Sequence, residues 1–330
     1  MAIDCGASGT GFIHHACLYD SDEAFVAMAL PFVEAGLVAG EPVLAATTPA
    51  NIELLRDALG ARAHALDTAE SAYFGRRPVE RVSAFLRYWN HRKVPGRQMR
   101  IIAEPLWAGK STRQVAEWKR MESGLNVLLA DADLWMICPY DTRTVPAAVA
   151  EAASATHPGQ VVGAEVMSCD AYVDPDAYAV AGDAPLPEPP AGAARLQGPV
   201  TPAAVRRFVR NRAQGAGLAG ARLAMAEIVA NEALTYLLQC GQQGARPDEA
   251  AGARVCAWEE PGILTWDLFA TERSAAPAAW AGFAPPGAAA GPDDGLWLIR
   301  NLCESVEVRS VDGRLRMRLR YAGAGDAERL

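Results

Sequence analysis

Apolar positions in the first half of the chain follow two alternating spacings. Short, continuous apolar runs at 42–47, 99–103 and 134–138 predict buried strands. Between them, apolar residues recur at helical spacing, most clearly over 21–39 and 112–129, which predicts amphipathic helices. Alternation of strands and helices is typical of an α/β layer, so we expect a mostly parallel sheet in the region 12–172.

The pattern changes after residue 172. Residues 173–199 are rich in proline and alanine and show no hydrophobic periodicity, which is typical of a semi-rigid linker. We therefore predict one domain at 12–172, a linker at 173–199 and a second domain at 200–321. The second domain shows two helical patterns (202–214 and 222–238), two strands (254–258 and 263–269), a helix (295–303) and a hairpin (306–321). This order predicts an α+β sandwich with a helical layer on one face.

Composition narrows the classes of protein. The 330 residues are 51% hydrophobic, which excludes global disorder, and the formal net charge of −8 argues against direct nucleic-acid binding. Four arginines cluster at 206, 207, 210 and 212; a solvated helix face explains them better than a basic patch does. The seven cysteines lack C-x-x-C spacing and indicate reduced thiols. With no leader pattern and no apolar run long enough for a bilayer, we expect a cytoplasmic protein without membrane contact.

The second domain carries two features that together suggest a nucleotide pocket. Glu227 and Asn231 stand four residues apart on a predicted helix, so their side chains share one face. A carboxylate there can polarise a hydroxyl or water, and a carboxamide can help to hold a magnesium ion. This spacing alone is also typical of a solvated helix face. The glycine-bearing loop from Gly291 to Gly295, which can present free backbone N–H groups to phosphate, favours the pocket.

The segments 223–231, 255–264 and 294–310 resemble the anti-sigma-factor serine-kinase branch of the GHKL ATPases, over roughly 197–321. The resemblance implies a Bergerat/GHKL ATPase fold that binds ATP and Mg²⁺. It implies that Glu227 is the catalytic base, that Asn231 binds the magnesium of ATP, and that Gly291, Gly295 and Leu296 belong to the loop over the phosphates. It further implies a sigma factor or an anti-sigma-factor antagonist as partner, and a homodimer, because kinases of this branch are often dimers.

Two departures from that family weaken the case for catalysis. Ala270 stands where the family carries the aspartate that contacts adenine, and Asp267, three residues earlier, is the nearest candidate for that role. The helix also continues past Asn231 where the family usually ends it with His-Gly. An unmade adenine hydrogen bond costs about 1–3 kcal/mol, so we expect ATP binding to be weak or lost. Two interpretations stay open: a serine/threonine kinase, or a non-catalytic module that only docks its partner. A histidine-kinase remnant is disfavoured, because the second domain contains no histidine.

The first domain offers polar and aromatic residues at predicted strand ends. Ligands of parallel α/β sheets bind outside the carboxyl ends of the strands, where Glu104, Trp107, Tyr140 and Asp141 fall. They can equally be core-edge aromatics and a helix cap. His14 and His15 are adjacent on a predicted strand and should point to opposite faces. Because no Cys or His lies at zinc spacing from them, a structural or pocket-lining role is favoured over metal binding.

The blocks 14–25, 31–44, 104–107 and 138–142 resemble, in order, the MEDS sensory domain of methanogen, methylotroph and dichloromethane-regulator proteins, over about 12–172. The resemblance implies a sensor of an unknown small ligand with a RecA-like layout. No phosphate-loop motif occurs, so we predict no ATP hydrolysis in this half. The pocket candidates that the resemblance implies are His14, His15, Tyr19, Glu104, Trp107, Tyr140 and Asp141. Together the two halves predict a signalling regulator of transcription.

Overall fold

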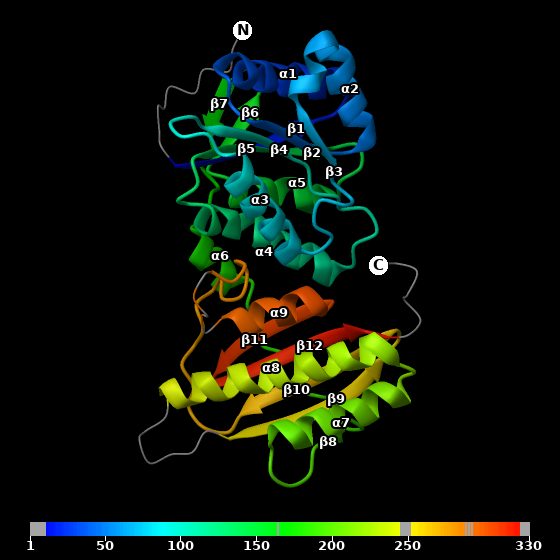
Figure 1. Ribbon diagram of the computed structural model, residues 1–330. Helices are drawn as coiled ribbons and strands as arrows, with labels where there is room; N and C mark the ends of the chain where they lie inside the picture. The colour runs from blue at the N-terminus through cyan, green and yellow to red at the C-terminus, as the bar shows by residue number, and fades with distance from the viewer. Residues whose placement is uncertain are drawn as a thin grey trace. The chain divides into compact units, whose positions relative to one another are not determined.

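A computed structural model describes residues 11–323, except 164, 245–251, 288, 290 and 292, and gives only the backbone of 242–244. The chain divides between Gly182 and Asp183 into two compact units, called here the N-terminal unit and the C-terminal unit. Figure 1 labels their helices and strands. In the part of the chain that the structure describes, no helix is long and apolar enough to cross a membrane.

The N-terminal unit is built on a seven-stranded sheet in the order β3-β2-β4-β5-β1-β6-β7. All neighbouring strands are parallel except β6 and β7, which confirms the prediction of an α/β unit with a mostly parallel sheet. The strands are β1 (Phe12–Tyr19), β2 (Val43–Thr47), β3 (Asp67–Glu70), β4 (Met99–Ala103), β5 (Leu134–Asp141), β6 (Gly159–Val162) and β7 (Glu165–Ser168).

Six α-helices and one 3₁₀-helix complete the described part of this unit. They are α1 (Asp22–Ala39), α2 (Pro49–Leu59), η1 (Gly60–Ala65), α3 (Pro78–Arg92), α4 (Thr112–Leu128), α5 (Ala147–Thr156) and α6 (Pro175–Ala181). Local sequence explains where they begin. The Ser21 side chain accepts a hydrogen bond from the Ala24 N–H, and Ser111 and Gln114 form a capping box at α4. Such caps contribute about 0.5–2 kcal/mol each.

The helices divide between the two faces of the sheet (Figure 1). Helices α1 and α2 bury Phe25, Phe32 and Leu55 against one face, which Trp135 and Ile137 of β5 share. Because side chains alternate along a strand, Met136 and Cys138 point to the other face, where α4 lies. We call these the α1 face and the α4 face. Each candidate residue on a strand belongs to one of them.

The C-terminal unit is an antiparallel sheet in the order β11-β12-β10-β9-β8, separate from the first sheet. Its strands are β8 (Ala194–Arg195), β9 (Ala253–Glu260), β10 (Ile263–Ala270), β11 (Ser305–Val311) and β12 (Arg314–Ala322). Its helices are α7 (Pro202–Gly215), α8 (Gly220–Gly244) and α9 (Asp294–Leu302). The predicted hairpin of β11 and β12 turns at Asp312 and Gly313, both with positive φ, as a tight two-residue turn requires.

One face of this sheet packs against the helices and the other is polar. Trp266 and Leu268 of β10, with Met317 and Leu319 of β12, form the core beneath α8. The residues between them point the other way, so the opposite face carries Asp267 and a ladder of three buried arginines, Arg316, Arg318 and Arg320. The predicted helical layer on one face is therefore present in this unit.

Residues 173–199, expected as a linker, contain regular structure. Helix α6 belongs to the N-terminal unit, where Arg120 of α4 donates to the Ala179 carbonyl, and β8 joins the antiparallel sheet. Between them the chain crosses the polar face of that sheet. Arg316 donates to the Leu186 and Pro187 carbonyls, and Arg318 donates to the Pro187 carbonyl. Prolines remove N–H donors but leave carbonyl acceptors, which explains how a proline-rich segment suits an arginine ladder.

Candidate functional site

The two adjacent histidines of β1 lie on opposite faces of the sheet, as predicted. On the α4 face, His14 Nδ1 is 3.2 Å from Asn126 Oδ1 and its Nε2 is 3.3 Å from Cys138 Sγ. On the α1 face, the Trp135 indole N–H donates to His15 Nδ1 at 3.2 Å. Burial lowers the pKa of His15 to about 4, so this imidazole is neutral at physiological pH.

Tyr19 and Glu104 meet on the α1 face, at the carboxyl ends of β1 and β4. The Tyr19 hydroxyl donates to Glu104 Oε1 at 2.9 Å, and the Asn51 amide donates to Glu104 Oε2 at 2.9 Å. The Thr47 hydroxyl and the Thr48 N–H also donate to Glu104 Oε2. Burial and the neighbouring carboxylate raise the pKa of Tyr19. This network is buried and its members satisfy one another, so it is a closed cluster at the edge where ligands of such sheets bind.

Asp141 lies at the end of β5 and is tied to its own loop. Its carboxylate accepts from the Arg143 guanidinium at 2.8 and 2.9 Å and from the Arg143 N–H at 3.0 Å. These hydrogen bonds lower the pKa of Asp141. The Arg143 guanidinium also lies over the Tyr19 ring, 5.7 Å from its centroid, so Asp141 borders the Tyr19–Glu104 network.

Trp107 and Tyr140 belong to an aromatic cluster on the α4 face. Their rings stack with centroids 6.1 Å apart, and Tyr140 meets His157 edge-on at 5.9 Å. His157 in turn lies against His14, with ring centroids 4.0 Å apart. The Trp107 indole N–H is buried without a hydrogen-bond partner among the described residues. The pocket candidates are thus divided between two faces rather than gathered in one cavity.

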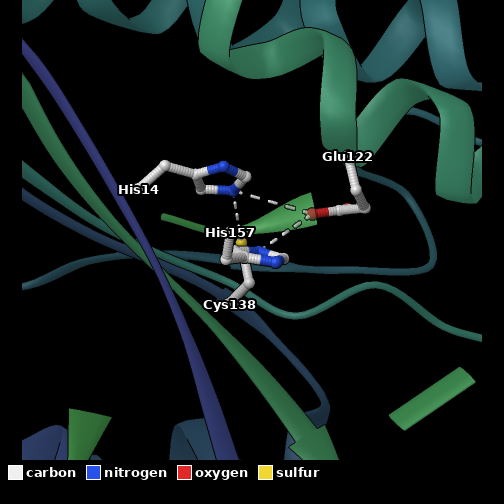
Figure 2. A group of neighbouring side chains, drawn as sticks. All are labelled: His14, Glu122, Cys138 and His157. Atoms are coloured by element: carbon white, nitrogen blue, oxygen red, sulfur yellow. Dashed lines mark hydrogen bonds and ion pairs between the residues drawn. The ribbon is translucent and has the colours of Figure 1, made fainter. Parts of the chain in front are cut away.

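Four buried side chains converge beside this aromatic cluster, and the sequence analysis singled out only one of them. His14 of β1, Glu122 of α4, Cys138 of β5 and His157 after α5 each point one ligand atom at a common point, and these atoms all lie within 4.8 Å of one another (Figure 2). His14 Nε2 and Glu122 Oε2 are 3.7 Å apart, and His157 Nε2 and Glu122 Oε2 are 3.6 Å apart. Burial raises the pKa of Glu122 to about 7.

In the C-terminal unit, Glu227 and Asn231 line one groove, as their spacing predicted. The groove has a volume of about 720 Å³ and lies between α7 and α8. Both side chains are engaged by arginines of α7. Arg210 donates to both carboxylate oxygens of Glu227 at 2.7 and 2.6 Å, and Arg206 donates to Asn231 Oδ1 at 2.7 Å. The hydrogen bonds from Arg210 hold the pKa of Glu227 below its usual range.

The glycine loop lies on the neighbouring side of α8. A side chain at Gly295 would come within 3.0 Å of the Glu232 carboxylate, and the Tyr236 hydroxyl lies 3.2 Å from Asp293 Oδ1. The Gly291 N–H donates to Asp294 Oδ2 at 2.8 Å, and Pro292 lies outside the described residues. Leu296 is a fully buried core residue beneath α8. Gly295 therefore packs against Glu232 of α8, whereas Leu296 faces the core.

The structure does not bring Asp267 to that groove. Asp267 projects from β10 to the polar face of the sheet, opposite the helices, because its neighbours Trp266 and Leu268 fill the core. It is fully buried and accepts hydrogen bonds from Arg316 at 2.8 Å and Arg318 at 2.6 and 2.7 Å. Ala270 lies in the core, so neither residue presents an acceptor beside Glu227 and Asn231.

Residues 13–158 match the family model of the MEDS domain, described as the methanogen/methylotroph, DcmR sensory domain. The resemblance of the N-terminal half is thereby confirmed, and it indicates a signalling or regulatory role. All four members of the buried cluster fall inside the matched residues. No curated protein matches the chain.

Proposed function

We propose that the chain is a signalling regulator whose N-terminal unit senses a small molecule or a partner protein and whose C-terminal unit controls transcription. The C-terminal unit would do so by binding a sigma factor or an anti-sigma-factor antagonist. Three observations support this role. They are the sensory-domain match over 13–158, the resemblance of 223–310 to anti-sigma-factor kinases of the Bergerat/GHKL fold, and the placement of Glu227 and Asn231 in one groove.

The arginine pairs of α7 favour docking over phosphoryl transfer. A general base needs a carboxylate that can accept a proton, and Arg210 holds both oxygens of Glu227 in its charged form. The carboxamide oxygen that would ligate magnesium accepts from Arg206 instead. As arranged, these residues do not fit a magnesium ion, which prefers free oxygen ligands. The observation that carries the docking proposal is therefore the double engagement of Glu227 and Asn231.

The walls of the groove suit a protein partner. Ile228 lines the groove beside Glu227 and is 46% exposed, and Leu223 also lines it. Apolar side chains beside arginines and a carboxylate are the usual mixture of a protein-binding surface. We test this by measuring the binding of the purified full chain to purified sigma factors and their antagonists. Arg210→Glu should weaken binding at least about tenfold, because it places two carboxylates together in the groove.

A matched control separates docking from general charge. Arg207 is on the same helix and exposed, but it does not line the groove, so Arg207→Glu should leave the affinity unchanged. Equal losses of affinity in both variants would show that the groove is not the binding site. If no sigma factor or antagonist binds at concentrations on the order of 10 μM, the docking role fails.

The kinase interpretation remains the second candidate, because two guanidinium groups beside a groove also suit phosphate oxygens. Calorimetry with Mg·ATP on the wild type and on Asn231→Ala decides between them. Heat of binding that disappears in Asn231→Ala supports a nucleotide pocket. The docking proposal expects no heat at millimolar Mg·ATP in either protein, and that result would end the kinase interpretation.

A further inference from the structure

The four-residue cluster of the N-terminal unit has the dimensions of a tetrahedral metal site. Zinc binds imidazole nitrogen and carboxylate oxygen at about 2.0–2.2 Å and thiolate sulfur at about 2.3 Å, so the edges of such a tetrahedron are about 3.3–3.7 Å long. Three edges of the cluster are 3.3, 3.6 and 3.7 Å, between His14 Nε2 and Cys138 Sγ, His157 Nε2 and Glu122 Oε2, and His14 Nε2 and Glu122 Oε2. All four ligand atoms lie within 4.8 Å of one another, so one ion fits among them once the longer distances close by about 1 Å.

Both histidines are oriented as metal ligands usually are. A ligating imidazole commonly donates its other ring N–H to a carbonyl, carboxylate or amide oxygen, which fixes the tautomer. His157 Nδ1 lies 2.9 Å from the Ala153 carbonyl, an obligate acceptor, so its Nε2 carries the lone pair. His14 Nδ1 lies 3.2 Å from Asn126 Oδ1. The Asn126 amide is held in turn by the carbonyls of Ser123 and Thr156, so its oxygen faces His14.

Two of the four ligand atoms are buried without a hydrogen bond. Glu122 Oε2 and His157 Nε2 have no partner among the described residues, although both side chains are fully or almost fully buried. An unsatisfied buried polar atom is costly, and two of them aimed at one point indicate a missing partner. A dication would satisfy both atoms at once.

We propose that His14, Glu122, Cys138 and His157 form a zinc(II) site that joins α4 and the end of α5 to strands β1 and β5. Thiolate and imidazole ligands suit zinc and not the hard cations calcium and magnesium. Four protein ligands close the coordination sphere, so the site is a structural or regulatory centre rather than a hydrolytic one. On binding, a zinc–sulfur bond forms and the Cys138 thiol, which donates to His14 Nε2 in the metal-free cluster, loses its proton to the buffer.

This proposal goes beyond the proposed function and stands independently of it. Zinc in the N-terminal unit requires neither a sigma factor nor ATP. The ligands come from residues up to 143 positions apart, His14 to His157, so the site can form only in the folded unit. The bound ion would then hold the helices of the α4 face against the sheet.

Metal content and cobalt spectroscopy test the site on the full chain. The wild-type protein, stripped with a chelator and reloaded with Zn²⁺ alone, should retain one equivalent after gel filtration. Loading with Co²⁺ should give a thiolate-to-cobalt charge-transfer band and the visible bands of a four-coordinate ion. Less than about a tenth of an equivalent of zinc in the wild-type protein would overturn the proposal, and so would a cobalt spectrum without the thiolate band.

Three variants locate the ion. Cys138→Ser should remove the charge-transfer band, whereas Cys17→Ala should keep it, because Cys17 is an equally buried cysteine of β1 on the α1 face. Asn126→Ala keeps all four ligands but frees His14 Nδ1, and should lower zinc affinity about 10- to 100-fold. If Cys17→Ala loses the band and Cys138→Ser retains it, the site is elsewhere and the proposal is wrong. Circular dichroism confirms that each variant is folded.

Discussion

Each unit buries a carboxylate, and the two carboxylates differ in how their surroundings satisfy them. Asp267 in the C-terminal unit is fully buried and accepts four hydrogen bonds from Arg316 and Arg318. Glu122 in the N-terminal unit is buried to the same degree, yet its Oε2 has no hydrogen-bond partner among the described residues.

This difference distinguishes a buried carboxylate that only stabilises the fold from one that is available to bind a ligand. Two guanidinium groups donate to Asp267, and the carbonyls of 186 and 187 accept from the same two arginines, so every partner in this group is satisfied. The charge on Glu122 is incompletely compensated, and its raised pKa of about 7 reflects that desolvation. A buried carboxylate that lacks hydrogen-bond partners is therefore a better indicator of a functional site than one that is fully paired. The following experiments test that distinction.

The largest effect should come from Asp267→Ala. This change removes the buried counter-charge that Arg316 and Arg318 share and leaves Arg316 only the exposed Glu188, which should cost about 3–5 kcal/mol of unfolding free energy. Urea titration with hydrogen exchange of β10 and β12 peptides measures it. Glu188→Ala is the control, because this partner of Arg316 is 84% exposed and should contribute below about 1 kcal/mol. Equal losses would mean that the buried aspartate is not the anchor of the ladder.

Glu122→Met should act in the opposite direction when zinc is absent. It replaces an incompletely satisfied carboxylate by an apolar side chain of similar length, so the metal-free protein should gain about 1–2 kcal/mol. With zinc present, the same variant should be less stable than the wild type, because it lacks one of the four ligands. Hydrogen exchange of α4 peptides, with and without chelator, gives both values. If Glu122→Met lost more than about 2 kcal/mol of unfolding free energy in the presence of chelator, Glu122 would be satisfied without metal.

Tyr19→Phe should have a smaller effect. It removes one of several hydrogen bonds to Glu104, whose other oxygen keeps those from Thr47, Thr48 and Asn51, so we expect a loss of about 1 kcal/mol. The measurement is hydrogen exchange of the β1 and β4 peptides as a function of urea concentration, from which the unfolding midpoint is read. Tyr73→Phe serves as the control, because Tyr73 is 71% exposed and should change nothing. A much larger loss would place Tyr19 with Asp267 among the structural anchors.

Arg210→Ala should have the smallest effect on stability. The Arg210 side chain is more than half exposed, so its pair with Glu227 is screened by solvent and the thermal midpoint should not move measurably. Partner binding should nevertheless weaken in the same variant. A marked loss of stability, with unchanged partner binding, would make the pair a structural element of α7 and α8.

The fold of both units could largely be predicted from hydrophobic spacing. The runs at 42–47, 99–103 and 134–138 correspond to β2, β4 and β5, and β5 continues to Asp141 because its pairing with β1 extends to Tyr19. Residues 173–199 were harder to predict. Pairing with β9 and with the arginine ladder holds that segment, and neither interaction leaves a local pattern in it.

The buried cluster could not be predicted from local spacing. No Cys or His lies at zinc spacing from His14 in the sequence, which favours a structural role for this histidine. The sheet nevertheless brings the Cys138 Sγ of the adjacent strand within 3.3 Å of His14 Nε2. Glu122 stands on a helix where acidic residues are ordinary, and His157 follows another helix. The parallel pairing of β1 with β5, which places Ala16 opposite Cys138, is the information that sequence spacing lacked.

The arginine ladder of β12 also restricts how the C-terminal unit can misfold. Arginines and apolar residues alternate from Arg314 to Arg320, so a strand shifted by one residue would drive Arg316, Arg318 and Arg320 beneath α8. Such a slip would expose Met317 and Leu319 on the polar face at the same time. The chain therefore has a single energetically acceptable pairing between β10 and β12. Trapped, misaligned hairpins should be short-lived during folding, even though the adjoining segment is rich in proline.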